Sequence, residues 1–203
     1  MDAVVADGLL RDFGGGRRVG PVGFTVRAGE LVALRGSNGA GKSTILRAVC
    51  GEERPDAGSV HVLGRAPRRA ASWFRTEVGV LEDRSAFPDL TVREHLELVA
   101  VGHGLGAERA ASVAAACRLA DHADLSPHKL SSGLRQLFAL AAILIPERTR
   151  LLVLDEPERH LDARARTWLA ATLRARAATG TAVLTATHAP ELAAAATRAV
   201  TLA

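Results

Sequence analysis

The most informative segment of this 203-residue chain reads Gly36-Ser37-Asn38-Gly39-Ala40-Gly41-Lys42-Ser43, and Thr44 follows it. The segment matches the pattern G-x-x-x-x-G-K-[ST], in which a glycine-rich loop binds phosphate groups. The apolar run Leu31 to Arg35 directly before it predicts a strand, and residues 42–50 predict a helix that ends before Gly51. The pattern requires this order of strand, loop and helix, so we expect a phosphate-binding loop here.

The residue types in this loop suit a nucleoside triphosphate. Glycines let successive backbone N–H groups point inward, and the free N–H groups at the start of the next helix favour anions. Lys42 is one of only two lysines in the chain, and its ammonium group is expected at the β- and γ-phosphates. The Ser43 hydroxyl is a suitable ligand for Mg²⁺. The loop therefore predicts a site for a nucleotide with its Mg²⁺ ion.

A second segment supplies the acids that such a site needs. Four aliphatic residues, Leu151 to Leu154, precede Asp155 and Glu156. They predict a strand covered on both faces, as in a parallel α/β sheet, with the two acids at its carboxyl end, where ligands bind. Asp155 suits Mg²⁺ through a water molecule, and Glu156 suits the deprotonation of an attacking water. This arrangement predicts hydrolysis rather than transfer to a second substrate.

With these segments in order, the chain resembles the ATP-binding cassette (ABC) ATPases over nearly its whole length. Residues 130–136, Leu-Ser-Ser-Gly-Leu-Arg-Gln, look like the signature motif of that family. Glu156-Pro157 followed by Leu161-Asp162 looks like its D-loop, and Thr187-His188 looks like its switch histidine. Phe13 matches the position of an aromatic residue that stacks on adenine, although a packing role fits Phe13 almost as well.

The resemblance implies a mechanism in which two cassettes meet head to tail. ATP would lie between the phosphate-binding loop of one cassette and Ser131, Ser132 and Gly133 of the other, with Asp162 nearby. His188 would contact the γ-phosphate and stabilise charge that develops on it. ATP binding would join the two cassettes and hydrolysis would release them, which moves a separate transmembrane permease. The implied cofactors are ATP and Mg²⁺, and the implied partners are a permease subunit and a second ABC ATPase subunit, identical or different.

Two segments depart from the family pattern. Where the family has a glutamine that touches Mg²⁺, this chain has Glu82 and Asp83. Asp83 can still meet the metal, but it adds negative charge beside a triphosphate. In the signature segment, Ser132 replaces a glycine and Leu134 replaces a glutamine, which predicts a weaker grip on the opposing ATP.

The alternation of strands and helices predicts an α/β fold, and the resemblance specifies it as a P-loop NTPase core with an antiparallel β subdomain and an inserted α-helical subdomain. We expect one domain over residues 1–203, with residues 1–87 and 136–203 forming the core and β subdomain and residues 88–135 the helical subdomain. Thr91 with Glu94 predicts a capping box at the start of one helix. A further helix is predicted from about Ala107 to Ala120.

The composition indicates the class of protein and the cellular compartment in which the chain works. Hydrophobic residues are 48% and charged residues 24%, as in ordinary globular proteins. The longest uncharged apolar run, Leu137 to Pro146, is too short to span a bilayer, and Asp2 and Asp7 interrupt any secretion signal. We therefore expect a cytoplasmic chain that reaches the inner membrane through its permease, with Cys50 and Cys117 as buried apolar groups.

A nucleic-acid partner is not expected, and one alternative function stays open. The net charge is only +4, the arginines are scattered, and aromatic residues make up 3% of the chain. The alternative is a soluble ABC-type ATPase that acts on DNA or ribosomes. Relatives of that kind carry long coiled-coil insertions or two cassettes in one chain, and this sequence has neither.

Overall fold

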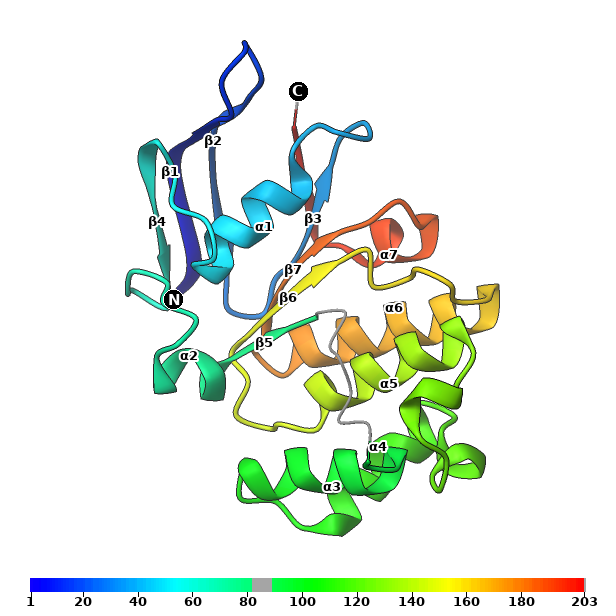
Figure 1. Cartoon of the computed structure of the whole chain (residues 1–203). Coiled ribbons are helices and arrows are strands. Elements are labelled where there is room, and N and C mark those ends of the chain that lie inside the picture. The colour runs from blue at the N-terminus through cyan, green and yellow to red at the C-terminus, as the bar shows by residue number, and fades with distance from the viewer. Residues whose placement is uncertain (82–88, 203) are drawn as a thin grey trace.

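The protein has a mixed α/β fold built on two sheets (Figure 1). The computed structural model describes residues 1–81 and 89–202. The smaller sheet is antiparallel, with the strand order β2-β1-β4. Its strands are β1 (Asp2–Asp12), β2 (Arg18–Arg27) and β4 (Ala57–Val62). This sheet matches the predicted antiparallel β subdomain.

The larger sheet is parallel and has the strand order β5-β6-β7-β3-β8. Its strands are β5 (Val78–Val80), β6 (Leu151–Asp155), β7 (Ala182–Ala186), β3 (Leu31–Arg35) and β8 (Arg198–Thr201). Side chains alternate between its faces: Leu152 and Leu154 belong to one core cluster, whereas Leu151 and Val153 belong to the other. Both faces are therefore covered, which confirms the prediction for residues 151–154.

Helix α1 (Lys42–Cys50) lies between the two sheets (Figure 1). Its Ile45 and Val49 share a core cluster with Val4 of β1 and Leu34 of β3. Gly51 ends the helix with φ of 72° and donates to the carbonyls of the last turn, as predicted. Because both sheets hold α1 in place, the N-terminus of the helix and the loop before it have a fixed position.

The other face of the parallel sheet carries the remaining helices except one, residues 72–77, whose Phe74 belongs to the first cluster. Leu140 of α5 (Ser132–Leu144) and Leu169 of α6 (Ala163–Ala178) pack with Leu154 in the second core cluster. Helices α3 (Val92–Gly102) and α4 (Ala107–Ala116) pack through this cluster on the outer side of α5 (Figure 1). The smaller elements are α2 (Ser72–Glu77), α7 (Pro190–Ala195) and two 3-10 turns, Ala120–His122 and Pro127–Lys129.

The local predictions for this region are partly right. Thr91 and Glu94 form the predicted capping box at the start of α3. The predicted C-terminal end of the helix that begins at Ala107 is wrong, because α4 stops at Ala116 and not at about Ala120. Arg118 adopts a φ of 57°, and the Leu119 N–H bonds back to the Ala114 carbonyl, so the chain turns and buries Leu119 completely. The division at residues 88 and 136 stays a prediction: residue 88 lies outside the described residues and residue 136 lies within α5.

No helix within residues 1–81 and 89–202 has both the length and the apolar character that a membrane-spanning segment needs. Helix α6 spans 16 residues, and its Leu169 and Leu173 belong to the same core cluster as Leu154 of β6 and Val183 of β7.

The two cysteines provide a test of this core. Cys50 and Cys117 are free and buried, and burial raises the pKa of each thiol from 9.0 to about 12. At pH 8 the thiolate population is therefore about a thousandfold below that of an exposed cysteine. We expect neither thiol to react with a maleimide or disulfide reagent in the folded chain within minutes, and both to react in denaturant. Rapid labelling of the folded chain, counted by mass spectrometry, would contradict this packing.

Candidate active site

The glycine-rich loop, residues 36–43, connects β3 to α1 in a conformation that depends on its glycines. Gly39 and Gly41 have φ of 86° and 94°, which side-chain-bearing residues rarely adopt. A Cβ atom on Gly41 would lie 2.3 Å from the Val19 side chain of β2. The antiparallel sheet therefore packs directly against the loop, and the space at position 41 admits only glycine.

Lys42 lies under this loop rather than in solvent. The residue is 7% exposed, and its Nζ donates to the carbonyl oxygens of Gly36 at 2.9 Å and Ser37 at 3.0 Å. Ser37, Asn38 and Gly39 are exposed, Gly36, Ala40, Gly41 and Ser43 are half-buried, and Thr44 is buried in the first turn of α1. The structure thus places a buried cation among backbone groups at the start of a helix, as a phosphate site needs.

The two acids stand at the carboxyl end of β6. Asp155 is the last residue of the strand and is exposed, and Glu156 follows with a φ of 44°. The Glu156 N–H donates to the Ala186 carbonyl at 2.9 Å, which holds this strained residue beside the end of β7. His188 comes two residues after β7, and its Nε2 lies 3.9 Å from Glu156 Oε1. Adjacent parallel strands therefore bring the predicted base and the predicted histidine together.

Two clefts border the loop. One is lined by Ser43, Asp155 and Glu156, and it also includes Ser132 at the start of α5. The other is lined by Gly36, Thr187 and His188. The residues that line these two clefts do not include Phe13, Ser131, Gly133 or Asp162. The structure thus gathers the loop, the acids and His188 around the ends of β3, β6 and β7.

The segment predicted as a signature motif begins α5. The Ser131 hydroxyl accepts from the Leu134 N–H at 3.3 Å and caps the helix, while Ser131 and Ser132 are exposed. Gly133 sits close to the chain after β6, since a Cβ there would approach the His160 carbonyl oxygen to 2.9 Å. Gln136 also donates to the Pro157 carbonyl at 2.9 Å. The start of α5 is therefore joined to the segment after β6.

Asp162 and Phe13 lie at the edge of this arrangement. Asp162 caps α6 by accepting from the Ala165 N–H at 2.6 Å, and its other oxygen lies 3.8 Å from Arg118. Phe13 is 42% exposed in the hairpin loop between β1 and β2. The guanidinium groups of Arg11 and Arg17 lie 5.4 and 5.2 Å from its ring centroid. Adenine stacking by Phe13 stays a prediction.

The donor set of the site suits Mg²⁺ only in combination with phosphate. Within the described residues, no group of three or more His, Cys, Asp or Glu side chains is arranged to hold a metal. Ser43 and Asp155 line the same cleft, which provides a hydroxyl and a carboxylate oxygen. Mg²⁺ is typically held by one or two protein oxygens together with phosphate oxygens and water, so these residues fit it. Asp83, the other predicted metal ligand, and Glu82 lie outside the described residues.

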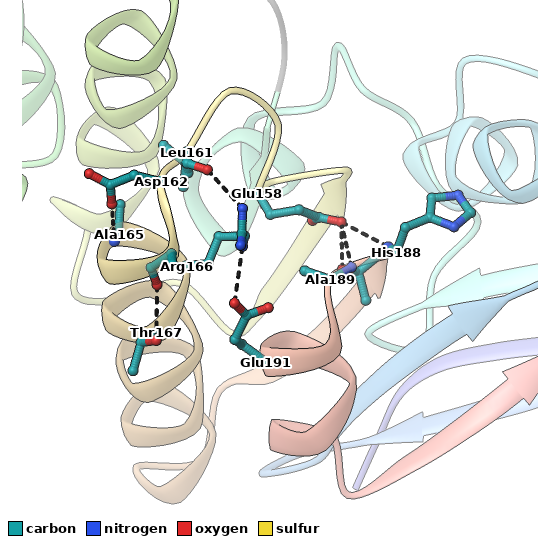
Figure 2. Close-up of polar contacts among 11 residues, drawn as sticks. Glu158, Leu161, Asp162, Ala165, Arg166, Thr167, His188, Ala189 and Glu191 are labelled. Carbon is teal, nitrogen blue, oxygen red and sulfur yellow. Dashed lines mark hydrogen bonds and ion pairs between the residues drawn. The ribbon is translucent and has the colours of Figure 1, made fainter.

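One residue that the sequence analysis does not single out holds the segment that carries His188. Glu158 Oε1 accepts from the Thr187 hydroxyl at 2.7 Å and from the N–H groups of His188 at 2.8 Å and Ala189 at 3.1 Å (Figure 2). In the sequence, Glu158 is recognisable only as a charged residue within the predicted D-loop. That observation does not predict its contact with His188, which lies 30 residues further along the chain.

A neighbouring ion pair lies between α6 and α7. Arg166 donates to Glu191 at 3.1 Å and to the Leu161 carbonyl at 3.1 Å (Figure 2). The Glu191 carboxyl accepts from its own backbone N–H and from Arg166, and both contacts hold its pKa below the ordinary value. The end of the segment after β6 is thereby linked to the helix that follows His188.

Comparison with known proteins identifies the family of this arrangement. The family model described as ABC transporter matches residues 19–159, more than half of the chain. The chain belongs to the ABC transporter family. The part that matches the ABC transporter family contains the glycine-rich loop, the start of α5 and the acids after β6, whereas His188 and Phe13 lie outside it.

Individual members of the ABC transporter family agree with this assignment. The chain is 35% identical over 192 residues to the arabinose import ATP-binding protein AraG 2 of Burkholderia cenocepacia, covering 90% of this chain and 37% of that protein. It is 36% identical over 181 residues to the Nod factor export ATP-binding protein I of Burkholderia lata, covering 87% and 59%. The chain thus spans less than two thirds of either relative.

A solved structure supports the fold. The ATP-binding subunit of an ABC transporter superposes with a TM-score of 0.86 at 26% identity, covering 98% of this chain and 85% of that one. The predicted P-loop NTPase fold of the ABC ATPases is confirmed.

Proposed function

We propose that this chain is the ATP-binding subunit of an ABC transporter, which binds ATP with Mg²⁺, hydrolyses it and drives a separate permease. One observation carries the proposal: the buried Lys42 loop, Asp155, Glu156 and His188 meet at the carboxyl ends of β3, β6 and β7. Membership in the family supports the same assignment.

The chemistry follows from the groups at this edge of the sheet. Lys42 and the backbone N–H groups around it bind the phosphates, and Ser43 with Asp155 would hold the metal. Mg²⁺, when bound, withdraws charge from the phosphate oxygens. Glu156 accepts the proton of the attacking water, and His188 donates to the oxygen on which charge develops. The distance of 3.9 Å between these two side chains allows both to face one phosphoryl group.

A second cassette completes the site in this proposal. Ser131 and Ser132 are exposed at the N-terminus of α5, so a neighbouring molecule can reach the Ser132 hydroxyl and the hydroxyl hydrogen of Ser131, whose oxygen caps the helix. Asp162 is 68% exposed and lies at the start of α6. We propose that these residues contact the ATP held by the opposing cassette, so that the nucleotide joins two copies and hydrolysis separates them.

Coupling to transport is the remaining part of the proposal. The relatives act in import and in export, so the proposal is confined to the coupling itself. The chain would work on the cytoplasmic face of the inner membrane, held there by its permease. A soluble ATPase acting on DNA or ribosomes has no observation in its favour.

Phosphate release with and without Mg²⁺ tests the proposed activity. With ATP and Mg²⁺ we expect steady hydrolysis, and with excess EDTA we expect a loss of about hundredfold or more, since the metal neutralises transition-state charge. Molar mass from light scattering should change reversibly from one copy to two when ATP is added. Absence of ATP binding, or hydrolysis that EDTA does not affect, would overturn the proposal.

Co-purification tests the transport role separately. A polytopic membrane protein that co-purifies with the chain would support this role, and ribosomes or DNA instead would contradict it.

A further inference from the structure

The contacts of Glu158 join two loops that follow neighbouring strands. Glu158 lies after β6, in the segment that begins with Glu156 and ends with Asp162, whereas its partners follow β7. One carboxylate oxygen accepts all of their hydrogen bonds, from one hydroxyl and two backbone N–H groups (Figure 2). A carboxylate that accepts several N–H bonds holds a loop more firmly than a neutral acceptor does.

The backbone at His188 depends on this carboxylate. The side chain of His188 is 48% exposed, and its neighbour Glu156 lies 3.9 Å away, beyond hydrogen-bond distance. The Thr187 hydroxyl, which donates to Glu158, also accepts from the Ala189 N–H at 3.0 Å. The imidazole therefore projects from a short segment whose three residues all donate to Glu158, so the direction of that projection is set by Glu158.

The ion pair between Arg166 and Glu191 adds a second link between the same two segments. Arg166 on α6 contacts the Leu161 carbonyl, near the end of the loop that holds Glu158, and Glu191 on α7, just past Ala189. The first link holds the His188 segment itself, and the second holds Glu191, two residues after Ala189 (Figure 2). The loop from Glu156 to Asp162 and the residues around His188 are consequently tied together as one unit.

We propose that Glu158 is a positioning residue for ATP hydrolysis, which fixes the backbone of His188 so that its imidazole faces the same phosphoryl group as Glu156. The proposal rests on the proposed function. A displacement of a reacting group by about 1 Å can reduce a rate by about hundredfold, so a tether on the His188 backbone acts on kcat.

Amide hydrogen exchange on the nucleotide-free chain tests the tether without any activity. In Glu158→Ala, the His188 amide loses its acceptor, and the Ala189 amide keeps only its bond to the Thr187 hydroxyl, which has itself lost its acceptor. We expect exchange to accelerate by about tenfold or more at His188 and by less at Ala189, with the amides of Val183 and Leu184 in β7 unchanged. Glu158→Gln retains an acceptor oxygen and should show a smaller increase. Unchanged exchange at His188 and Ala189 in the alanine variant would overturn the proposal.

Kinetics then separate a positioning role from a merely structural one. We expect Glu158→Ala to lower kcat by about tenfold or more while KM for ATP changes by less than about twofold, with partial rescue in Glu158→Gln. In a His188→Ala background, Glu158→Ala should lower kcat no further, since Glu158 acts through His188. An equal loss of kcat in both backgrounds would overturn the proposal.

Glu30→Ala is the matched control. Glu30 is also partly buried and accepts from a backbone N–H, that of Arg27 at 2.9 Å, but it precedes β3 at the opposite end of the sheet. This variant should leave kcat unchanged.

If Glu158→Ala does not fold, Glu158→Gln replaces it in both measurements, and the expected result is accelerated exchange at the same two amides. If the parent chain hydrolyses no ATP, the proposed function fails, whereas the exchange experiment still decides whether the tether exists.

Discussion

Glu156→Gln should reduce ATP hydrolysis by about a thousandfold and leave nucleotide binding intact. The substitution removes the carboxylate that accepts the proton of the attacking water, and general base catalysis contributes typically about 10²–10⁴-fold. Glutamine has nearly the same shape, and the Glu156 N–H bond to the Ala186 carbonyl comes from the backbone, so the local structure stays in place. The variant is expected to collect as an ATP-bound pair of cassettes. Single-turnover phosphate release and light scattering in ATP and Mg²⁺ measure both effects.

The control for this experiment is Glu108→Gln, an exposed carboxylate on α4 outside both clefts. It should hydrolyse ATP at the parent rate. If Glu156→Gln hydrolyses ATP within about tenfold of the parent, Glu156 does not act as the base. If the variant loses hydrolysis but never forms pairs in ATP, the assigned base stands and the proposed pairing of two copies is contradicted.

Much of this site was predictable because its signals are local. The loop at residues 36–43 is recognised by its glycines and lysine, and both predicted neighbours, β3 and α1, have the predicted bounds. Four consecutive aliphatic residues followed by two acids likewise predict β6, which differs from the expectation only in including Asp155. Helix ends with a cap in the sequence, such as Thr91 with Glu94, were equally clear.

The failures concern features that packing decides. No residue near Ala116 is typical of a helix end, so the sequence does not predict where α4 stops. The left-handed residue of the turn is Arg118, a residue type that does not favour this conformation, and the turn is stabilised by the burial of Leu119. The role of Glu158 was equally hidden, since its partners follow a different strand and meet it only because β6 and β7 pair. Contacts between loops of neighbouring parallel strands require the strand order, which no local pattern supplies.

Lys42→Ala should weaken ATP binding by about hundredfold or more, which corresponds to about 3 kcal/mol. The lysine is the one cation buried within the loop itself, and charge-assisted hydrogen bonds to phosphate are among the strong ones. Lys42→Met separates charge from packing, because methionine retains much of the apolar stem that α1 and the loop enclose. If charge is what binds ATP, the alanine and methionine variants should lose similar affinity in titrations with a fluorescent ATP analogue.

Lys129→Ala removes the only other lysine of the chain, which is exposed in the turn before Leu130, and it should bind ATP as the parent does. A Lys42→Met variant that keeps parental affinity would contradict the assignment of this loop to phosphate binding.

The same titration distinguishes two possible roles of Lys42, which are closure of the loop and direct contact with phosphate. The Lys42 Nζ donates to the Gly36 and Ser37 carbonyls, so the lysine closes its own loop. If closure rather than phosphate contact were its main task, both variants would bind ADP as poorly as ATP. A direct contact with the β- and γ-phosphates instead predicts a larger loss for ATP than for ADP, because the alanine variant forfeits the γ-phosphate contact only when that phosphate is present.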